Sequence, residues 1–200
     1  MDSPGSFQLA AGPHGEPRVF AGRVEQAARV TLAHSSRVAV ACAWPGARGY
    51  SLGIDVERVR SADLPDNEYA FSLAERRLWH QNRAGSLPLA AWTVKEAAWK
   101  ALVPSPRLGP ETVEIIELDA NTGRARVRTK GRLSEVSGGL HIRARFVNLA
   151  GPDGEYWFAL AAALPDGSAV GEWIGLEALA ESHDWSALWE IKLTMTAGRS

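Results

Sequence analysis

The sequence has almost no cysteine and no long apolar run. Its single cysteine, Cys42, excludes an intramolecular disulfide framework and any all-cysteine metal site. No apolar run approaches the ~20 residues that a membrane-spanning helix needs. The N-terminal stretch also lacks the basic and apolar regions of a secretory signal. These absences predict a soluble, cytoplasmic protein without a membrane partner.

An excess of either charge is also missing, since 22 Lys and Arg stand against 23 Asp and Glu among 200 residues. That balance argues against a basic arm for nucleic acid, so a charged partner has to be met by a local patch. Hydrophobic residues make up 46% of the chain, enough to bury a core. The length suits one compact domain or two small lobes that share a core.

Strand patterns occupy the first third of the chain after an irregular start. Residues 1–17 are rich in Gly and Pro without periodicity, which predicts a leader with little structure. The run 37–44, RVAVACAW, is apolar and ends at a Pro-Gly turn, which predicts a buried strand. Residues 50–59 alternate apolar and polar side chains and are predicted to be its hairpin partner.

Two helices are predicted next, followed by strands. Ser72 and Glu75 match a capping box that begins a helix reaching about residue 82, with Phe71 packed on its first turn. Pro88 opens a second helix that runs through Ala101. Alternating or apolar runs then predict antiparallel strands at 112–118, 124–129, 140–147 and 156–164, the first two joined by a turn at 121–123.

A weak internal similarity links the two halves of the chain. The run 156–164 has the character of 38–44, and each is followed by a Gly-containing segment, Gly53–Glu57 and, more loosely, 171–174. Internal duplication and chance similarity between Ala-rich strands are equally open on this pattern alone.

Two acidic residues on one strand are the first candidates for chemistry. Asp55 and Glu57 stand at i and i+2 and share a face, so both carboxylates can reach one hard cation. Gly53 on that face is expected to leave room for a phosphate group. The plainer alternative is a half-exposed strand with its acidic residues turned to solvent.

The second predicted helix carries Glu96 and Lys100 one turn apart. Such a pair is often only a surface ion pair. A carboxylate beside a cation, flanked by Trp92 and Trp99, also suits Mg²⁺-assisted phosphoryl chemistry.

The third candidate is the pair His34 and Ser35, directly before the strand 37–44. These two residues form either a phosphate-binding site or an ordinary surface turn.

In their order and separation these motifs resemble the 4′-phosphopantetheinyl transferases of the Sfp type. That family has Ser-His-Ser, Gly-(Ile/Val)-Asp-(Ile/Val)-Glu, Phe-Ser-x-x-Glu and Trp-(Thr/Ser)-x-Lys-Glu-(Ala/Ser)-x-x-Lys elements. They stand here as Ala33–Ser35, Gly53–Glu57, Phe71–Glu75 and Trp92–Lys100. The resemblance extends over residues 12–163.

The resemblance implies an α+β fold of two pseudo-twofold-related lobes with antiparallel sheets and packed helices, and with coenzyme A between the lobes. Residues 1–50 would be a shortened first lobe with a flexible leader. Residues 51–200 would be the second lobe, with the metal strand, the KEAAWK helix and the C-terminal strands. Such a relationship also favours the internal duplication.

The implied activity is transfer of the 4′-phosphopantetheine arm of coenzyme A onto a serine of an apo acyl or peptidyl carrier protein. The reaction depends on Mg²⁺, releases 3′,5′-ADP and serves polyketide, nonribosomal peptide or fatty acid biosynthesis. By resemblance, Asp55, Glu57 and Glu96 hold the metal, and Lys100 contacts the pyrophosphate. His34 and Ser35 bind phosphates of the nucleotide part, and Glu96 helps to deprotonate the serine.

Several positions depart from the family pattern on the nucleotide side. Glu16 stands where relatives often have Lys, although Arg18 or Arg23 could supply the cation. Ala33 replaces a Ser, and Val103-Pro104 replaces a Gly. One alternative is therefore a catalytically weakened homologue that binds a carrier protein or regulates an assembly line. Another is an unrelated metal-dependent phosphate-binding domain.

A docking patch is also predicted, because the recognition helix of a carrier protein is typically acidic. The candidates are arginines near the metal strand and on the capped helix: Arg58, Arg60, Arg76 and Arg77. The alternative is an ordinary solvated face.

Overall fold

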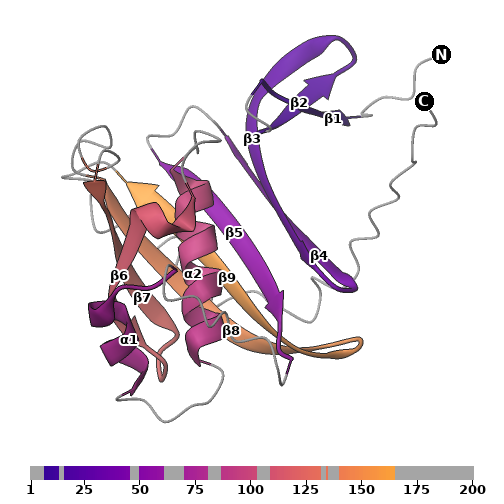
Figure 1. Ribbon diagram of the computed structural model, residues 1–200. Coiled ribbons are helices and arrows are strands. Elements are labelled where there is room, and N and C mark those ends of the chain that lie inside the picture. The colour runs from indigo at the N-terminus through magenta and orange to yellow at the C-terminus, as the bar shows by residue number, and fades with distance from the viewer. Residues whose placement is uncertain are drawn as a thin grey trace.

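The computed structural model contains two antiparallel sheets and two α-helices (Figure 1). It describes residues 7–13, 16–45, 50–60, 70–80, 87–102, 109–131, 134 and 140–164. The first sheet has the order β1 (Phe7–Ala11), β2 (Pro17–Ala21), β3 (Val24–Ser35), β4 (Val38–Pro45). The second has the order β5 (Ser51–Arg58), β9 (Gly154–Leu164), β8 (His141–Gly151), β7 (Arg124–Thr129), β6 (Val113–Asp119). The helices are α1 (Leu73–His80) and α2 (Leu87–Ala101), with a short 3₁₀ turn η1 (Pro110–Thr112). The predicted α+β architecture of antiparallel sheets with packed helices is confirmed.

Helix α2 lies across one face of the second sheet (Figure 1). Small side chains make this approach possible: Ala90, Ala97 and Ala98 of α2 are fully buried, as are Ala159 and Ala161 of β9. Because alanine adds little bulk between backbones, helix and sheet come close and fix the position of every side chain on the buried face of α2.

Gly53 is where the helix comes closest to β5. A Cβ at this position would stand 2.1 Å from the carbonyl oxygen of Ala97 and 2.4 Å from the amide nitrogen of Ala101. The expectation that Gly53 makes room for a phosphate is therefore wrong. The missing side chain admits the backbone of α2 instead.

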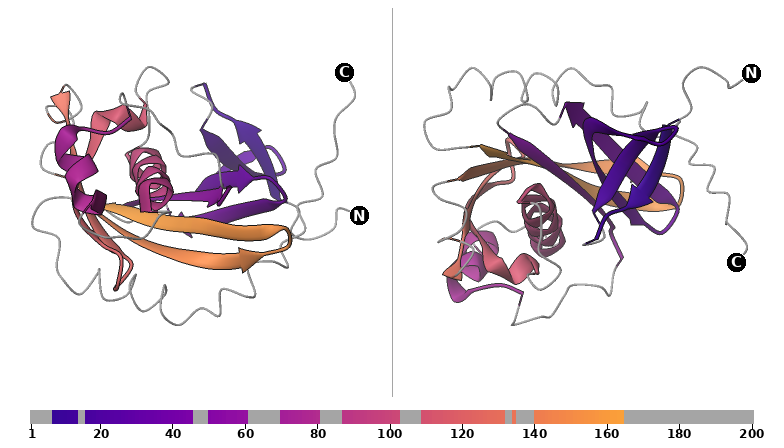
Figure 2. Two further views of the ribbon diagram at one scale, coloured as in Figure 1. Left: turned by 60° about the horizontal axis from the view of Figure 1, so that its bottom comes forward. Right: turned by 90° about the horizontal axis from the view of Figure 1, so that it is seen from above.

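The two sheets share a second core on the face of β5 that is turned away from α2 (Figure 2). Ala33, Val38 and Val40 of the first sheet pack there with residues of β5 and β9, among them Ile54 and Phe158. The first sheet ends at Pro45 and the second begins at Ser51, close to the predicted boundary at residue 50. Because the two sheets share this core, the division into lobes stays a prediction.

Two expectations about the first sheet are wrong. Within the predicted leader, Phe7–Ala11 forms β1 and pairs with β2, from Phe7 opposite Ala21 to Ala11 opposite Pro17. β5 is not the hairpin partner of β4: it pairs with β9 along its whole length, while β4 pairs with β3. The alternation of apolar and polar residues does not determine which strand pairs with which, because every strand offers the same backbone N–H and C=O groups.

The helices and the later strands agree with expectation, and their local signals act as predicted. The backbone N–H of Ser72 donates to Glu75 Oε2 at 2.7 Å, and that of Glu75 donates to Ser72 Oγ at 3.2 Å, which completes the capping box. Gly123 in the β6–β7 turn has φ of 64°. No helix of the described part is long and apolar enough to cross a membrane. The loose repeat at 171–174 and the Val103-Pro104 departure lie outside the described residues.

Candidate active site

Strand β5 and helix α2 bring four of the predicted residues together. Lys100 Nζ lies 2.7 Å from Asp55 Oδ1 and 4.0 Å from Glu96 Oε2, so its ammonium bridges the strand and the helix. Asp55 is almost fully buried, whereas Glu96 and Lys100 are partly exposed. The spacing argument is thus supported: Glu96 and Lys100 face the acidic strand and not only the solvent.

Asp55 is the most perturbed group of the site. Burial raises its pKa to about 7, and the negative charges of Glu96 and Glu57 act in the same direction, while Lys100 opposes them. Its Oδ2 atom is buried and has no hydrogen-bond partner among the described residues. A buried oxygen without a partner is costly, so this atom is a ready acceptor for an additional cation or donor.

Glu57 is held by the end of β3. Ser35 Oγ donates to Glu57 Oε2 at 3.2 Å and accepts the backbone N–H of Arg58 at 3.1 Å. Burial raises the pKa of Glu57, while the hydrogen bond from Ser35 and the nearby charges of Lys100, Arg60 and His34 oppose the rise. Ser35 therefore belongs to the site, and His34 lies near enough for its charge to act on Glu57.

The three predicted metal ligands, Asp55, Glu57 and Glu96, all lie near enough to Lys100 to interact with its charge. No group of three or more His, Cys, Asp or Glu side chains among the described residues is arranged to hold a metal ion. The Lys100 ammonium instead provides the positive charge between Asp55 and Glu96. The donors themselves fit Mg²⁺, because carboxylate oxygens are its usual protein ligands and Asp55 Oδ2 is unpaired in this arrangement.

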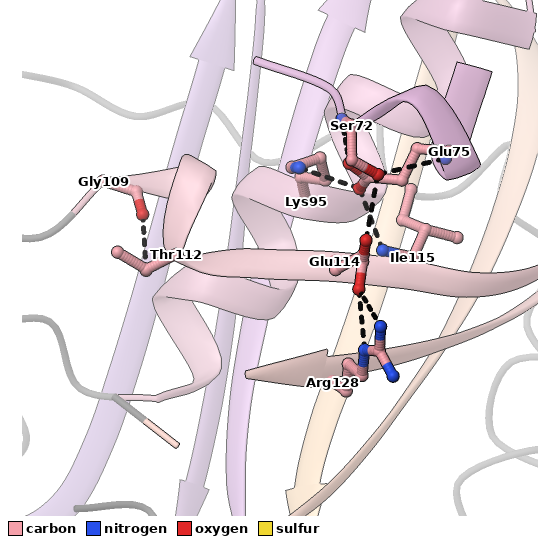
Figure 3. Close-up of polar contacts among 8 residues, drawn as sticks. All are labelled: Ser72, Glu75, Lys95, Gly109, Thr112, Glu114, Ile115 and Arg128. Atoms are coloured by element: carbon pink, nitrogen blue, oxygen red, sulfur yellow. Dashed lines mark hydrogen bonds and ion pairs between the residues drawn. The ribbon is translucent and has the colours of Figure 1, made fainter. Parts of the chain in front are cut away.

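A buried polar network sets the position of α2 (Figure 3). Lys95 Nζ donates to Glu75 Oε1 at 2.8 Å, and both side chains have no exposed surface. The same oxygen accepts the backbone N–H of Ile115 at 2.9 Å. Lys95 precedes Glu96, so this pair ties the functional turn of α2 to α1 and β6.

The network continues to the edge of the second sheet. Ser72 Oγ donates to Glu114 Oε1 at 2.9 Å, and Arg128 Nε donates to Glu114 Oε2 at 2.7 Å (Figure 3). The sequence signals a capping box at Ser72 but not the roles of Lys95 and Glu114. A lysine on the helix face that Ala91, Val94 and Ala98 also occupy is the pattern that could have pointed to Lys95.

Two of the predicted arginines, Arg18 and Arg58, have carboxylate partners that the sequence does not announce. Arg18 donates to Glu16 at 2.9 Å and to Glu25 at 3.3 Å, so its assignment to coenzyme A stays a prediction. Arg58 pairs with Asp153, and its predicted part in docking stays a prediction. Arg60 and Arg77 are exposed, as docking would require.

Comparisons with known proteins match the chain to one family. The family model described as the 4′-phosphopantetheinyl transferase superfamily (ACPS) matches residues 51–161, which include β5, α2 and most of β9. No curated protein sequence matches the chain. Among solved structures, the ACPS–CoA complex of Chronobacterium ammoniagenes is 25% identical, with 60% of this chain and 99% of that chain covered and a TM-score of 0.41. The apo-ACPS structure from the same organism is 24% identical, with 57% and 95% covered and a TM-score of 0.42. The chain belongs to the 4′-phosphopantetheinyl transferase superfamily.

Proposed function

We propose that the protein moves the 4′-phosphopantetheine arm of coenzyme A onto a serine of an apo acyl or peptidyl carrier protein, as a cytoplasmic, Mg²⁺-dependent transferase of the Sfp type. The observation that carries the proposal is the grouping of Asp55, Glu96 and Lys100 at the contact of β5 with α2. Family membership supports the reaction class.

Asp55, Glu57 and Glu96 would hold the Mg²⁺ ion. The ion supplies charge neutralisation and polarisation of the pyrophosphate when it is bound. The buried carboxylate of Asp55 and the half-buried carboxylates of Glu57 and Glu96 repel one another, and burial raises the pKa of each. Added positive charge relieves that repulsion, which favours binding of a cation and of a phosphate group beside Lys100.

Lys100 supplies the mobile positive charge of the site. Its side chain is 23% exposed and sits on the last turn of α2. An ammonium on a flexible stem can exchange the Asp55 carboxylate for a phosphate oxygen without moving the helix. Lys100 thereby neutralises charge on the leaving 3′,5′-ADP.

Glu96 would take the proton of the attacking serine. Its carboxylate is 19% exposed, which leaves it open to an incoming hydroxyl. His34, Ser35 and Arg18 would contact phosphates of the nucleotide part from the first sheet.

The test is to incubate the purified protein with coenzyme A, Mg²⁺ and apo carrier proteins of fatty acid, polyketide and peptide synthesis, and to measure the carriers by mass spectrometry. A phosphopantetheine adduct is expected on at least one carrier. Glu96→Gln should lower kcat by roughly 10²-fold or more, as loss of a general base does. The matched control is Glu117→Gln on β6, an exposed carboxylate paired with Arg126, which should leave kcat unchanged.

Two results would contradict the proposal. Full activity of Glu96→Gln rules out the assigned base. Absence of an adduct on every carrier rules out the transferase. If carrier binding persists without transfer, the protein is the weakened homologue that binds its partner.

A further inference from the structure

Two turns from different sheets meet beside Glu57 and are joined through one carboxylate. Asp153 lies in the β8–β9 turn, and Ser36 lies in the β3–β4 turn directly after Ser35. Ser36 Oγ donates to Asp153 Oδ2 at 2.9 Å. This is a contact between residues 117 positions apart in the chain, so tertiary structure alone creates it.

Asp153 also binds β5 and β9. The Tyr156 hydroxyl donates to Asp153 Oδ1, and Arg58 Nη1 lies 3.4 Å from Oδ2. Arg58 Nη2 donates further to the carbonyl oxygen of Asp153. Three donors from three segments therefore converge on one residue, and Arg58 is the residue next to Glu57.

The β3–β4 turn needs such support. Ser36 has φ of 53°, a left-handed conformation that is uncommon for residues other than glycine. Ser35 is tied to β5 by its bonds with Glu57 and the Arg58 amide. Contacts from both serines fix the direction of the chain at His34–Ser36, where an unsupported exposed turn would be mobile.

The negative charge of Asp153 suits its position among three donors. The hydrogen bond from Tyr156 leads the interactions that lower the pKa of Asp153, so the carboxylate is ionised at neutral pH. Tyr156 has no exposed surface, and a buried hydroxyl requires a partner. The ionised carboxylate can then satisfy Tyr156, Ser36 and Arg58 together.

We propose that Asp153 is a positioning residue that holds the β3–β4 turn against β5, so that His34 and Ser35 meet the phosphates of coenzyme A beside Glu57. The inference rests on the proposed function. It assigns Asp153 an effect on coenzyme A binding, because the residue orients the nucleotide side of the site and does not reach Glu96 or Lys100.

A second aspartate provides a matched control. Asp119 is the last residue of β6, and at the β6–β7 turn it accepts the backbone N–H of Asn121 at 2.9 Å and the Thr122 hydroxyl at 2.7 Å. These bonds lie within its own turn. Asp119→Ala therefore loosens a hairpin turn without touching the contact between the sheets.

The experiment compares Asp153→Ala, Asp119→Ala and the wild-type chain. Calorimetry measures the Kd for coenzyme A, and steady-state kinetics measure KM and kcat. Asp153→Ala should raise Kd and KM for coenzyme A about tenfold, as loss of a residue that orients a ligand contact does, with kcat within about twofold. Amide hydrogen exchange at residues 34–37 should quicken in Asp153→Ala and not in Asp119→Ala.

A milder variant guards against misfolding of Asp153→Ala. Ser36→Gly removes only the contact from the turn, and glycine accepts the positive φ without strain. It should weaken coenzyme A binding in the same direction. Unchanged affinity in both Asp153→Ala and Ser36→Gly overturns this inference alone. A wild-type chain without affinity for coenzyme A overturns the proposed function and this inference with it.

Discussion

The pair Glu75–Lys95 places two opposite charges where neither side chain has exposed surface. Glu75 accepts backbone N–H groups from Ser72 and Ile115, and the Lys95 ammonium lies 5.2 Å from the centre of the Phe71 ring. Desolvation of the charges is thus offset by one ion pair, two hydrogen bonds and a cation–π contact. Removing one partner leaves the other charge buried without a counter-charge. This lowers the free energy of unfolding by more than the intact pair contributes to it.

Glu75→Gln should therefore lower the free energy of unfolding by about 3–5 kcal/mol, the range for an uncompensated buried charge. The double variant Glu75→Gln/Lys95→Met should regain part of that loss, since no charge remains buried. Urea denaturation measures both. An exposed pair serves as comparison: Arg126→Gln removes the contact with Glu117 and should cost less than about 1 kcal/mol. Equal losses for the two single variants would refute the argument.

At the scale of elements, the contact of α2 with β5 decides whether the site exists. Glu96 and Lys100 sit on the helix, and Asp55 and Glu57 sit on the strand. The two groups meet because backbone packs on backbone at Gly53. The separation of the elements is thus set by a residue that takes no part in the chemistry.

Gly53→Ala should push α2 away from β5. The neighbours of the new Cβ are backbone atoms of Ala97 and Ala101, which cannot turn aside as a flexible side chain would. Overpacking of this kind costs about 1–3 kcal/mol of stability. The value of kcat should fall by more than the loss of folded protein explains, because the Lys100 ammonium is moved away from the Asp55 carboxylate. Ser51→Ala on the same strand is the control, and wild-type kcat in Gly53→Ala would contradict this account.

At the scale of the whole molecule, the two sheets are joined by one shared hydrophobic core. Ile54 is 2% exposed and packs in the core that joins β3 and β4 to β5 and β9. The opposite face of β5 carries the acidic residues. One strand therefore supports both the union of the sheets and the site.

Ile54→Ala should lower the free energy of unfolding by about 2–5 kcal/mol and leave a single transition. The chain has eight tryptophans, among them Trp44 of β4 and Trp157 of β9, so tryptophan fluorescence reports on both sheets together with other parts of the chain. Circular dichroism reports on both sheets. The two midpoints should coincide in wild type and variant. Val24→Ala, at a side chain 66% exposed, should change little. Separate transitions would show that the sheets fold independently.

Local signals carried most of the element predictions. The capping box, the proline at the start of α2 and the turn at Gly123 act through neighbours in the chain, so their effect can be read from adjacent residues. The strand β1 and the pairing of β5 with β9 depend on partners elsewhere, and there the predictions were wrong.

The sequence by itself determined the chemistry available at the site. Asp55 and Glu57 share a strand face, and Glu96 and Lys100 share a helix face, because the periods of strand and helix are set by the backbone. Tertiary structure decided what those faces meet. It brought Lys100 to Asp55, used Gly53 for helix packing and joined Ser36 to Asp153. Such contacts depend on close packing between distant segments, which no local pattern encodes.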